Sequence, residues 1–146
     1  AHELWLYFND VIQWIEHTFP VYRKELMRSV DWGALYRQFN DVALDPDALE
    51  EEISALIADD DVTNNKGIYA YVLTRQEKWL NLRTFSQNMK LAAYERQHGI
   101  CPICRQSFPF EKMDGDHITP WSEGGKTNPE NCQMLCRECN RRKSNH

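Results

Sequence analysis

Two pairs of cysteines near the C-terminal end of the chain have the spacing of a metal site. Cys101 and Cys104 lie in GICPIC, Cys136 and Cys139 lie in LCREC, and 31 residues separate the two pairs. Two such knuckles can present four thiolates in the tetrahedral geometry that a structural zinc ion prefers. Two disulfides are disfavoured because the chain shows no secretion signal and thiols inside cells stay reduced. Four unrelated buried cysteines are disfavoured because chance rarely produces two knuckles in so short a module, so we predict one structural zinc ion.

The segment between the knuckles is longer than a zinc ribbon needs, because a short hairpin would be enough there. MDGDHITPW is typical of a short strand ending at Pro120, SEGGKTNPE of a loop, and NCQML of a second strand. RECNRRKS can begin a helix at the second knuckle. The pattern predicts a hairpin followed by a helix, with four polar residues at fixed places: Asp116, His117, Asn131 and Asn140. The fifth cysteine, Cys132, is expected to be a small core residue.

The stretch DGDHITPWSEGGKTNPENCQMLCRECNRRK resembles the core of the HNH family of endonucleases, a branch of the ββα-metal (His-Me finger) nucleases. The similarity covers roughly residues 83–143. It rests on the Asp-His pair, a glycine-bearing loop, an asparagine five residues before the second knuckle, and CRECNRRK. The family usually has histidine as its last motif letter, whereas this chain has Asn140, as in the H-N-N variant of the family.

The resemblance implies a role for each of the four polar residues. His117 would be the general base that accepts a proton from the attacking water, a task suited to an imidazole. Asp116 would point to the opposite side of the strand and, with Asn140, would bind a catalytic divalent ion. An all-oxygen ligand set of this kind suits Mg²⁺ or Mn²⁺. Asn131 would hold the loop between the strands and so orient His117, while the zinc would fix the helix to the hairpin.

Each of these residues also has a purely structural interpretation. His117 could be a partly buried histidine with its hydrogen bonds satisfied, and Asp116 a charge at a strand edge. Asn131 could be a turn former, and Asn140 a helix-start residue that bonds to the knuckle backbone. The alternative function is a zinc-dependent nucleic-acid-binding module that does not cleave. Such a module does not need a carboxylate next to an imidazole at the end of one strand, so this pair of residues favours an enzyme.

The charge distribution is uneven along the chain. The formal net charge is −5, but residues 41–61 contain nine acidic residues and no Lys or Arg. Residues 62–146 contain 13 basic and 8 acidic residues, so the C-terminal half is basic. Solvated helix charges are the default interpretation of its cations, but beside a nuclease site some should contact DNA phosphates. These candidates are Arg137, Arg141, Arg142, Lys143 and Lys126.

The first 82 residues are predicted to form a helical bundle. Leu4, Phe8, Val11 and Ile15 recur at helical spacing before Pro20, and further helices are expected after the N-cap candidates Asp31 and Asp45. IYAYVLTR is compatible with a helix or a strand. We expect a mainly α chain with a small α+β part: a helical domain at 1–82, then a zinc-stapled ββα-metal nuclease domain at 83–146.

The helical part resembles the segment that joins a ParB/sulfiredoxin-like NTPase domain to a C-terminal HNH nuclease in bacterial phage-defence and restriction proteins. ELWLYFNDVIQWIEHTFPVYRKE and DWGALYRQFND carry this resemblance. It implies that the chain is the nuclease half of a longer cytoplasmic protein, without its N-terminal NTPase or sensor domain. The chain has no apolar run of membrane-spanning length, so a membrane is not an expected partner. The resemblance to HNH endonucleases implies DNA as the partner.

Overall fold

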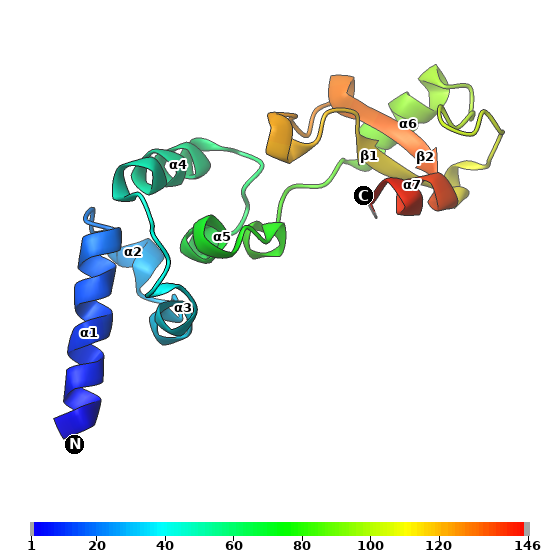
Figure 1. The fold of residues 1–146 in the computed structure, drawn as a ribbon. Helices are drawn as coiled ribbons and strands as arrows, with labels where there is room; N and C mark the ends of the chain where they lie inside the picture. Colours follow the sequence, from blue (N-terminus) through cyan, green and yellow to red (C-terminus); the bar gives the residue numbers. More distant parts are fainter. Residues whose placement is uncertain (1, 145–146) are drawn as a thin grey trace. The chain divides into compact units, whose positions relative to one another are not determined.

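The computed structural model describes residues 2–144 and divides the chain between Leu82 and Arg83 into two compact units, which are considered separately (Figure 1). Most of the regular structure is helical, and one two-stranded antiparallel sheet lies in the C-terminal unit. The predicted fold class is therefore confirmed. Among the described residues, no helix has the length and apolarity needed to cross a membrane.

The N-terminal unit consists of helices joined by short connections. They are α1 (His2–Thr18), α2 (Lys24–Met27), α3 (Trp32–Phe39), α4 (Pro46–Ala58), η1 (Asn65–Gly67), α5 (Ile68–Thr74) and η2 (Glu77–Leu80). Both expected N-caps are present: the Asp31 side chain accepts a hydrogen bond from Ala34 N, and the Asp45 side chain accepts two from the start of α4. The ambiguous stretch IYAYVLTR is helical and forms the buried centre of this unit, since every residue from 68 to 73 is buried.

The N-terminal part of the apolar stripe predicted for α1 is exposed. Val11 is buried, but Leu4 and Phe8 are 60% and 59% exposed. The face that contacts α3 carries Tyr7 and Trp14, both of which pack edge-on against the ring of Tyr36. Periodicity located the helix correctly, and the stripe is buried towards its C-terminal end, at Val11 and Phe19. Towards the N-terminus the contact is made by Tyr7, while Leu4 and Phe8 are exposed.

The C-terminal unit is a β-hairpin with a helix packed on each face. Its elements are α6 (Gln87–Arg96), η3 (Phe110–Lys112), β1 (Met113–His117), η4 (Trp121–Glu123), η5 (Pro129–Asn131), β2 (Cys132–Cys136) and α7 (Arg137–Ser144). The strands are antiparallel, and His117 lies opposite Cys132. The first strand ends at His117, three residues before the predicted end at Pro120. It ends there because Thr119 bonds to the side chain of Asn131 rather than to a strand.

Alternation along β1 separates two sets of side chains. Gly115 and His117 face the segment that contains Phe85 and α6. Asp114 and Asp116 point to the other face, where they contact residues of α7. A core cluster fills the unit around the hairpin and the cysteines: Phe85, Ala93, Cys101, Met113, Cys132, Met134, Leu135, Cys136 and Cys139. One strand therefore presents an imidazole to one side and two carboxylates to the other.

Candidate active site and metal centre

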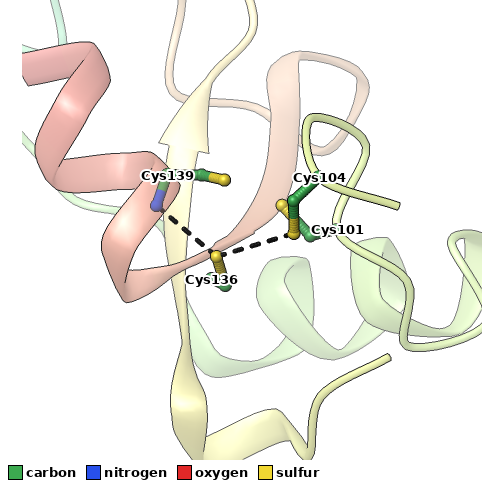
Figure 2. Close-up of side chains that lie close together, drawn as sticks. All are labelled: Cys101, Cys104, Cys136 and Cys139. Carbon is green, nitrogen blue, oxygen red and sulfur yellow. Dashed lines mark hydrogen bonds between the residues drawn. The ribbon is translucent and has the colours of Figure 1, made fainter. Parts of the chain in front are cut away.

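The four knuckle cysteines converge although they come from distant segments (Figure 2). Their sulfur atoms all lie within 4.8 Å of one another, and Cys104 Sγ is 3.9 Å from Cys136 Sγ. A tetrahedral zinc ion with Zn–S bonds of about 2.3 Å holds its sulfurs about 3.8 Å apart, so the cluster has the right size. Within residues 2–144, no other group of three or more Cys, His or carboxylate side chains is gathered in this way.

The backbone shapes each knuckle for metal binding. In the first, Arg105 N donates to Cys101 O at 2.8 Å and Arg105 adopts a left-handed conformation, which folds the chain back sharply. In the second, Cys136 ends β2 and its sulfur accepts a bond from Cys139 N at 3.4 Å, in the first turn of α7. A metal ion bound here ties the segment before β1 to the end of β2 and the start of α7.

The thiols of this cluster differ in proton affinity. Burial alone would raise the pKa of Cys101, but the backbone amides of Cys104, Cys136 and Ile103 outweigh it and lower that pKa to about 6. Burial, together with the neighbouring sulfurs, raises the pKa of Cys139 to about 12. All five cysteines are free thiols in this structure. Cys132 is buried outside the cluster at the start of β2.

His117 is held from two directions at the end of β1. Its ring packs on Phe85 with the centroids 4.3 Å apart, and its Nε2 lies 2.9 Å from the hydroxyl of Thr127. Thr127 is only 5% exposed, and its hydroxyl donates to Arg83 O at 3.1 Å. A hydroxyl has one proton and a carbonyl can only accept, so Nε2 must carry the proton donated to Thr127. This tautomer leaves the free lone pair of the ring on Nδ1.

Asp116 faces α7 from the other side of the sheet. Its carboxylate accepts a hydrogen bond from Gln133 Nε2 at 2.9 Å and forms an ion pair with Lys143. Asn140 lies on the same face of the hairpin, but its amide donates to Asp114 Oδ2 at 3.3 Å. The structure thus brings Asp116 and Asn140 to one face and adds a second carboxylate between the hairpin and the helix.

Asn131 closes the loop that joins the two strands. Its Oδ1 accepts from Thr119 N at 2.8 Å, and its Nδ2 donates to Thr119 O and Lys126 O, both at 2.9 Å. The loop also needs glycine at position 125, because a Cβ atom there would lie 1.8 Å from Thr119 O. Asn131 therefore holds the loop that carries Thr127, and its link to His117 runs through that loop.

The five basic candidates have different surroundings. Arg137 donates to Glu111 O at 2.7 Å, and Arg142 pairs with Glu138 one turn earlier on α7. Arg141 and Lys126 have exposed side chains. Lys143 is turned towards Asp116, unlike the surface phosphate contact expected from the sequence, and it also donates to His117 O at 2.9 Å.

Three residues near the site were not singled out from the sequence. The position of Asp114 could have been predicted from the sequence. Alternate residues of a strand share a face, and Asp114 lies two residues before Asp116. Thr127 lies in a polar loop, where nothing local indicates that its hydroxyl reaches the imidazole. Phe85 lies far from His117 in the sequence, so only tertiary packing shows their contact.

Comparisons with known proteins point to one family. Residues 101–146 match the family described as HNH endonuclease. In an alignment over 53 residues, the chain is 36% identical to the type IV methyl-directed restriction enzyme EcoKMcrA of Escherichia coli strain K12. The alignment covers 32% of this chain and 19% of the restriction enzyme, so the similarity extends over a small part of the longer protein.

Proposed function

We propose that this chain, whose C-terminal unit contains an HNH nuclease domain, is a metal-dependent DNA endonuclease that hydrolyses phosphodiester bonds. The observation that carries the proposal is the end of β1, where a hydrogen-bonded imidazole with one basic nitrogen adjoins a carboxylate on the opposite face. The expected products have 5′-phosphate and 3′-hydroxyl ends, as in the family that the motif resembles.

His117 is the proposed general base. Its Nδ1 takes the proton of the water that attacks phosphorus, while the Nε2 proton stays on the hydrogen bond to Thr127. The hydroxyl of Thr127 is fixed in turn by Arg83 O, and the ring plane is fixed by Phe85. These contacts hold the base in one orientation, so little rotational freedom must be lost when the substrate binds.

The donors on the other face fit a hard divalent cation. The carboxylates of Asp116 and Asp114 and the amide oxygen of Asn140 are oxygen ligands, and an ammonium group already lies against one of these carboxylates. Asp116 and Asn140 are the proposed protein ligands of Mg²⁺ or Mn²⁺. When bound, such an ion would neutralise charge on the scissile phosphate and on the departing 3′ oxygen.

The cysteine cluster is the proposed site of a structural zinc ion. Four buried or half-buried thiols leave no ligand position open for a substrate, as is typical of structural zinc sites. The ion would keep α7, which carries Asn140, in place against the hairpin that carries His117. The proposed contacts with DNA phosphates around the active site are made by four basic residues: Arg137, Arg141, Arg142 and Lys126.

The test of the proposed function is plasmid nicking with Mg²⁺ or Mn²⁺ by the native chain and by His117→Ala. The native chain is expected to nick only with the divalent ion, and His117→Ala to be strongly impaired. The rival is a zinc-dependent nucleic-acid-binding module without nuclease activity. If neither the native chain nor His117→Ala nicks any of several DNA forms, and both keep their zinc, the result would favour that binding module.

Substitutions of Thr127 test how the base is held. Thr127→Val keeps the shape but removes the hydroxyl, so we expect nicking to slow about fivefold, which corresponds to a hydrogen bond of about 1 kcal/mol. In ¹H–¹⁵N spectra the Nε2 proton of His117 should be visible in the native chain and lost to solvent exchange in the variant. Thr127→Ser is the matched control and should preserve both the rate and the proton signal. A native rate in Thr127→Val would show that the base is oriented without this hydroxyl.

Substitutions of Asn140 test its role as a ligand. Asn140→Ala removes an oxygen donor, so metal-dependent nicking should fall by at least about tenfold, the size seen when residues supporting metal ligands are removed. Asn140→His should retain or strengthen nicking, because an imidazole binds a divalent ion more firmly than a neutral amide does. The measurement is the nicking rate as a function of Mn²⁺ concentration. If Asn140→Ala cuts like the native chain, Asn140 is not a ligand.

The biological role proposed for the chain is restriction or phage defence. The similar protein of Escherichia coli is a methyl-directed restriction enzyme. The resemblance of the helical part to ParB/sulfiredoxin-like NTPase–HNH proteins supports the further proposal that an NTPase or sensor domain controls cutting. A comparison of methylated and unmethylated plasmids as substrates tests whether modification matters for this chain.

A further inference from the structure

The side chain of Lys143 lies in the proposed divalent-ion site. Its ammonium group forms an ion pair with Asp116 and donates a hydrogen bond of 2.9 Å to His117 O. Lys143 follows Asn140 by three residues on α7, which places both on the same face of the helix. The side chain of Asp116 is 17% exposed and that of Lys143 is 35% exposed, so the pair is partly withdrawn from water.

The other cations of α7 do not share this position. Arg142, the preceding residue, pairs with Glu138 on the exposed surface of the helix, and Arg137 is bonded to Glu111 O. The remaining described contacts of the two carboxylates on this face come from the neutral amides of Gln133 and Asn140. Lys143 is therefore the cation of α7 that lies on Asp116, on the face that also carries the carboxylate of Asp114.

The chemistry of lysine suits temporary occupation of such a site. An ammonium is a compact point charge on a flexible four-carbon stem, so it can neutralise a carboxylate and then move away without disturbing the helix. A divalent ion and an ammonium cannot occupy the same carboxylate oxygen, and their positive charges repel each other at short range. The Lys143 ammonium on Asp116 Oδ2 therefore opposes binding of the ion to this carboxylate.

We propose that Lys143 is a built-in counter-ion that competes with the divalent ion for Asp116 and so lowers the affinity of the site for the metal. The proposal rests on the part of the proposed function that makes Asp116 a metal ligand, and it does not depend on cleavage of DNA. Lys143 acts through Asp116, which makes it a residue that tunes metal binding. Once displaced, its ammonium becomes available to a DNA phosphate, so metal binding and phosphate binding support each other.

The experiment measures binding of Mn²⁺ to the zinc-loaded chain near neutral pH by isothermal titration calorimetry, without DNA. The thiolate cluster retains zinc in preference to Mn²⁺, so the signal reports the oxygen site. Lys143→Met should bind Mn²⁺ about tenfold more tightly than the native chain, equivalent to about 1.4 kcal/mol. Arg142→Met removes the same charge from the same helix away from Asp116 and should change the affinity by less than about twofold.

Two further variants make the outcome decisive. Lys143→Gln should also tighten Mn²⁺ binding, which keeps the test available if Lys143→Met does not fold. Asp116→Asn should abolish the tightening in either background, because the competition takes place on that carboxylate. Unchanged or weaker binding in the Lys143 variants, or tightening that persists with Asp116→Asn, overturns the proposal. If the binding results hold but the native chain does not nick DNA, the proposed function fails and the counter-ion role stands.

Discussion

Replacement of His117 with alanine is expected to slow metal-dependent nicking by about 10²- to 10⁴-fold, the contribution typical of a positioned general base. The loss should be large because no other imidazole is held in this way among the described residues, and the carboxylates of β1 point to the opposite face. The rate should be measured as single-turnover nicking of supercoiled plasmid at saturating Mn²⁺, so that chemistry rather than product release is compared.

The controls for this prediction separate loss of the base from loss of the fold. His98→Asn removes an exposed imidazole from the same unit, and asparagine tolerates the left-handed backbone of that position. This variant should nick like the native chain. His117→Ala should keep its zinc and bind Mn²⁺ with native affinity, because Asp116 lies on the other side of the sheet. A His117→Ala protein that binds both metals and still nicks at the native rate would remove His117 from the mechanism.

The sequence predicted the parts of the site that depend on short-range geometry. Two Cys-x-x-Cys knuckles specify four convergent sulfurs whatever lies between them, and the sulfurs do converge. Adjacent residues of a strand point to opposite faces, so the separation of Asp116 from His117 also followed from the sequence. Asp31 and Asp45 cap their helices as expected, because capping involves only the next three residues.

The features that the sequence did not predict depend on contacts between distant segments. Thr127 reaches His117 only because Asn131 and Gly125 fold the loop back on itself. Lys143 was expected among surface cations, since nothing in a run of basic residues indicates which one turns inward. Its direction is set by the position of α7 on the hairpin, which is a property of the tertiary fold.

The exposed part of the stripe on α1 has the same cause. An apolar stripe indicates that a helix is buried on one side, but it does not identify the neighbour that covers it. The rings of Tyr7 and Trp14 pack against Tyr36 of α3, and Val11 is buried on the same helix. Leu4 and Phe8 stay exposed although they continue the periodic pattern.

Loss of one knuckle cysteine is expected to have the largest effect on stability. Cys139→Ser should not retain zinc, and residues 100–143 should unfold. Binding of a structural zinc ion supplies about 10–16 kcal/mol in small zinc modules, more than the whole stability of most domains. The C-terminal unit has only a short two-stranded sheet, and four of the nine buried residues of its core are cysteines. Three of these four are knuckle cysteines. Little apolar surface therefore remains to stabilise the unit without the ion. Zinc content and amide hydrogen exchange measure the two effects.

Cys132→Ala is the matched control for this prediction, since it removes a buried thiol of the same unit that lies outside the cluster. It should keep one zinc ion per chain and cost about 1 kcal/mol, the amount expected for a small cavity. Thiol modification of the native chain should release one zinc ion and raise exchange in residues 100–143, while the buried amides of α5 in the N-terminal unit remain protected. A Cys139→Ser protein that is free of metal and still protected throughout the hairpin and α7 would show that the core holds this unit together without zinc. In that case the cluster could not be what positions Asn140 against His117.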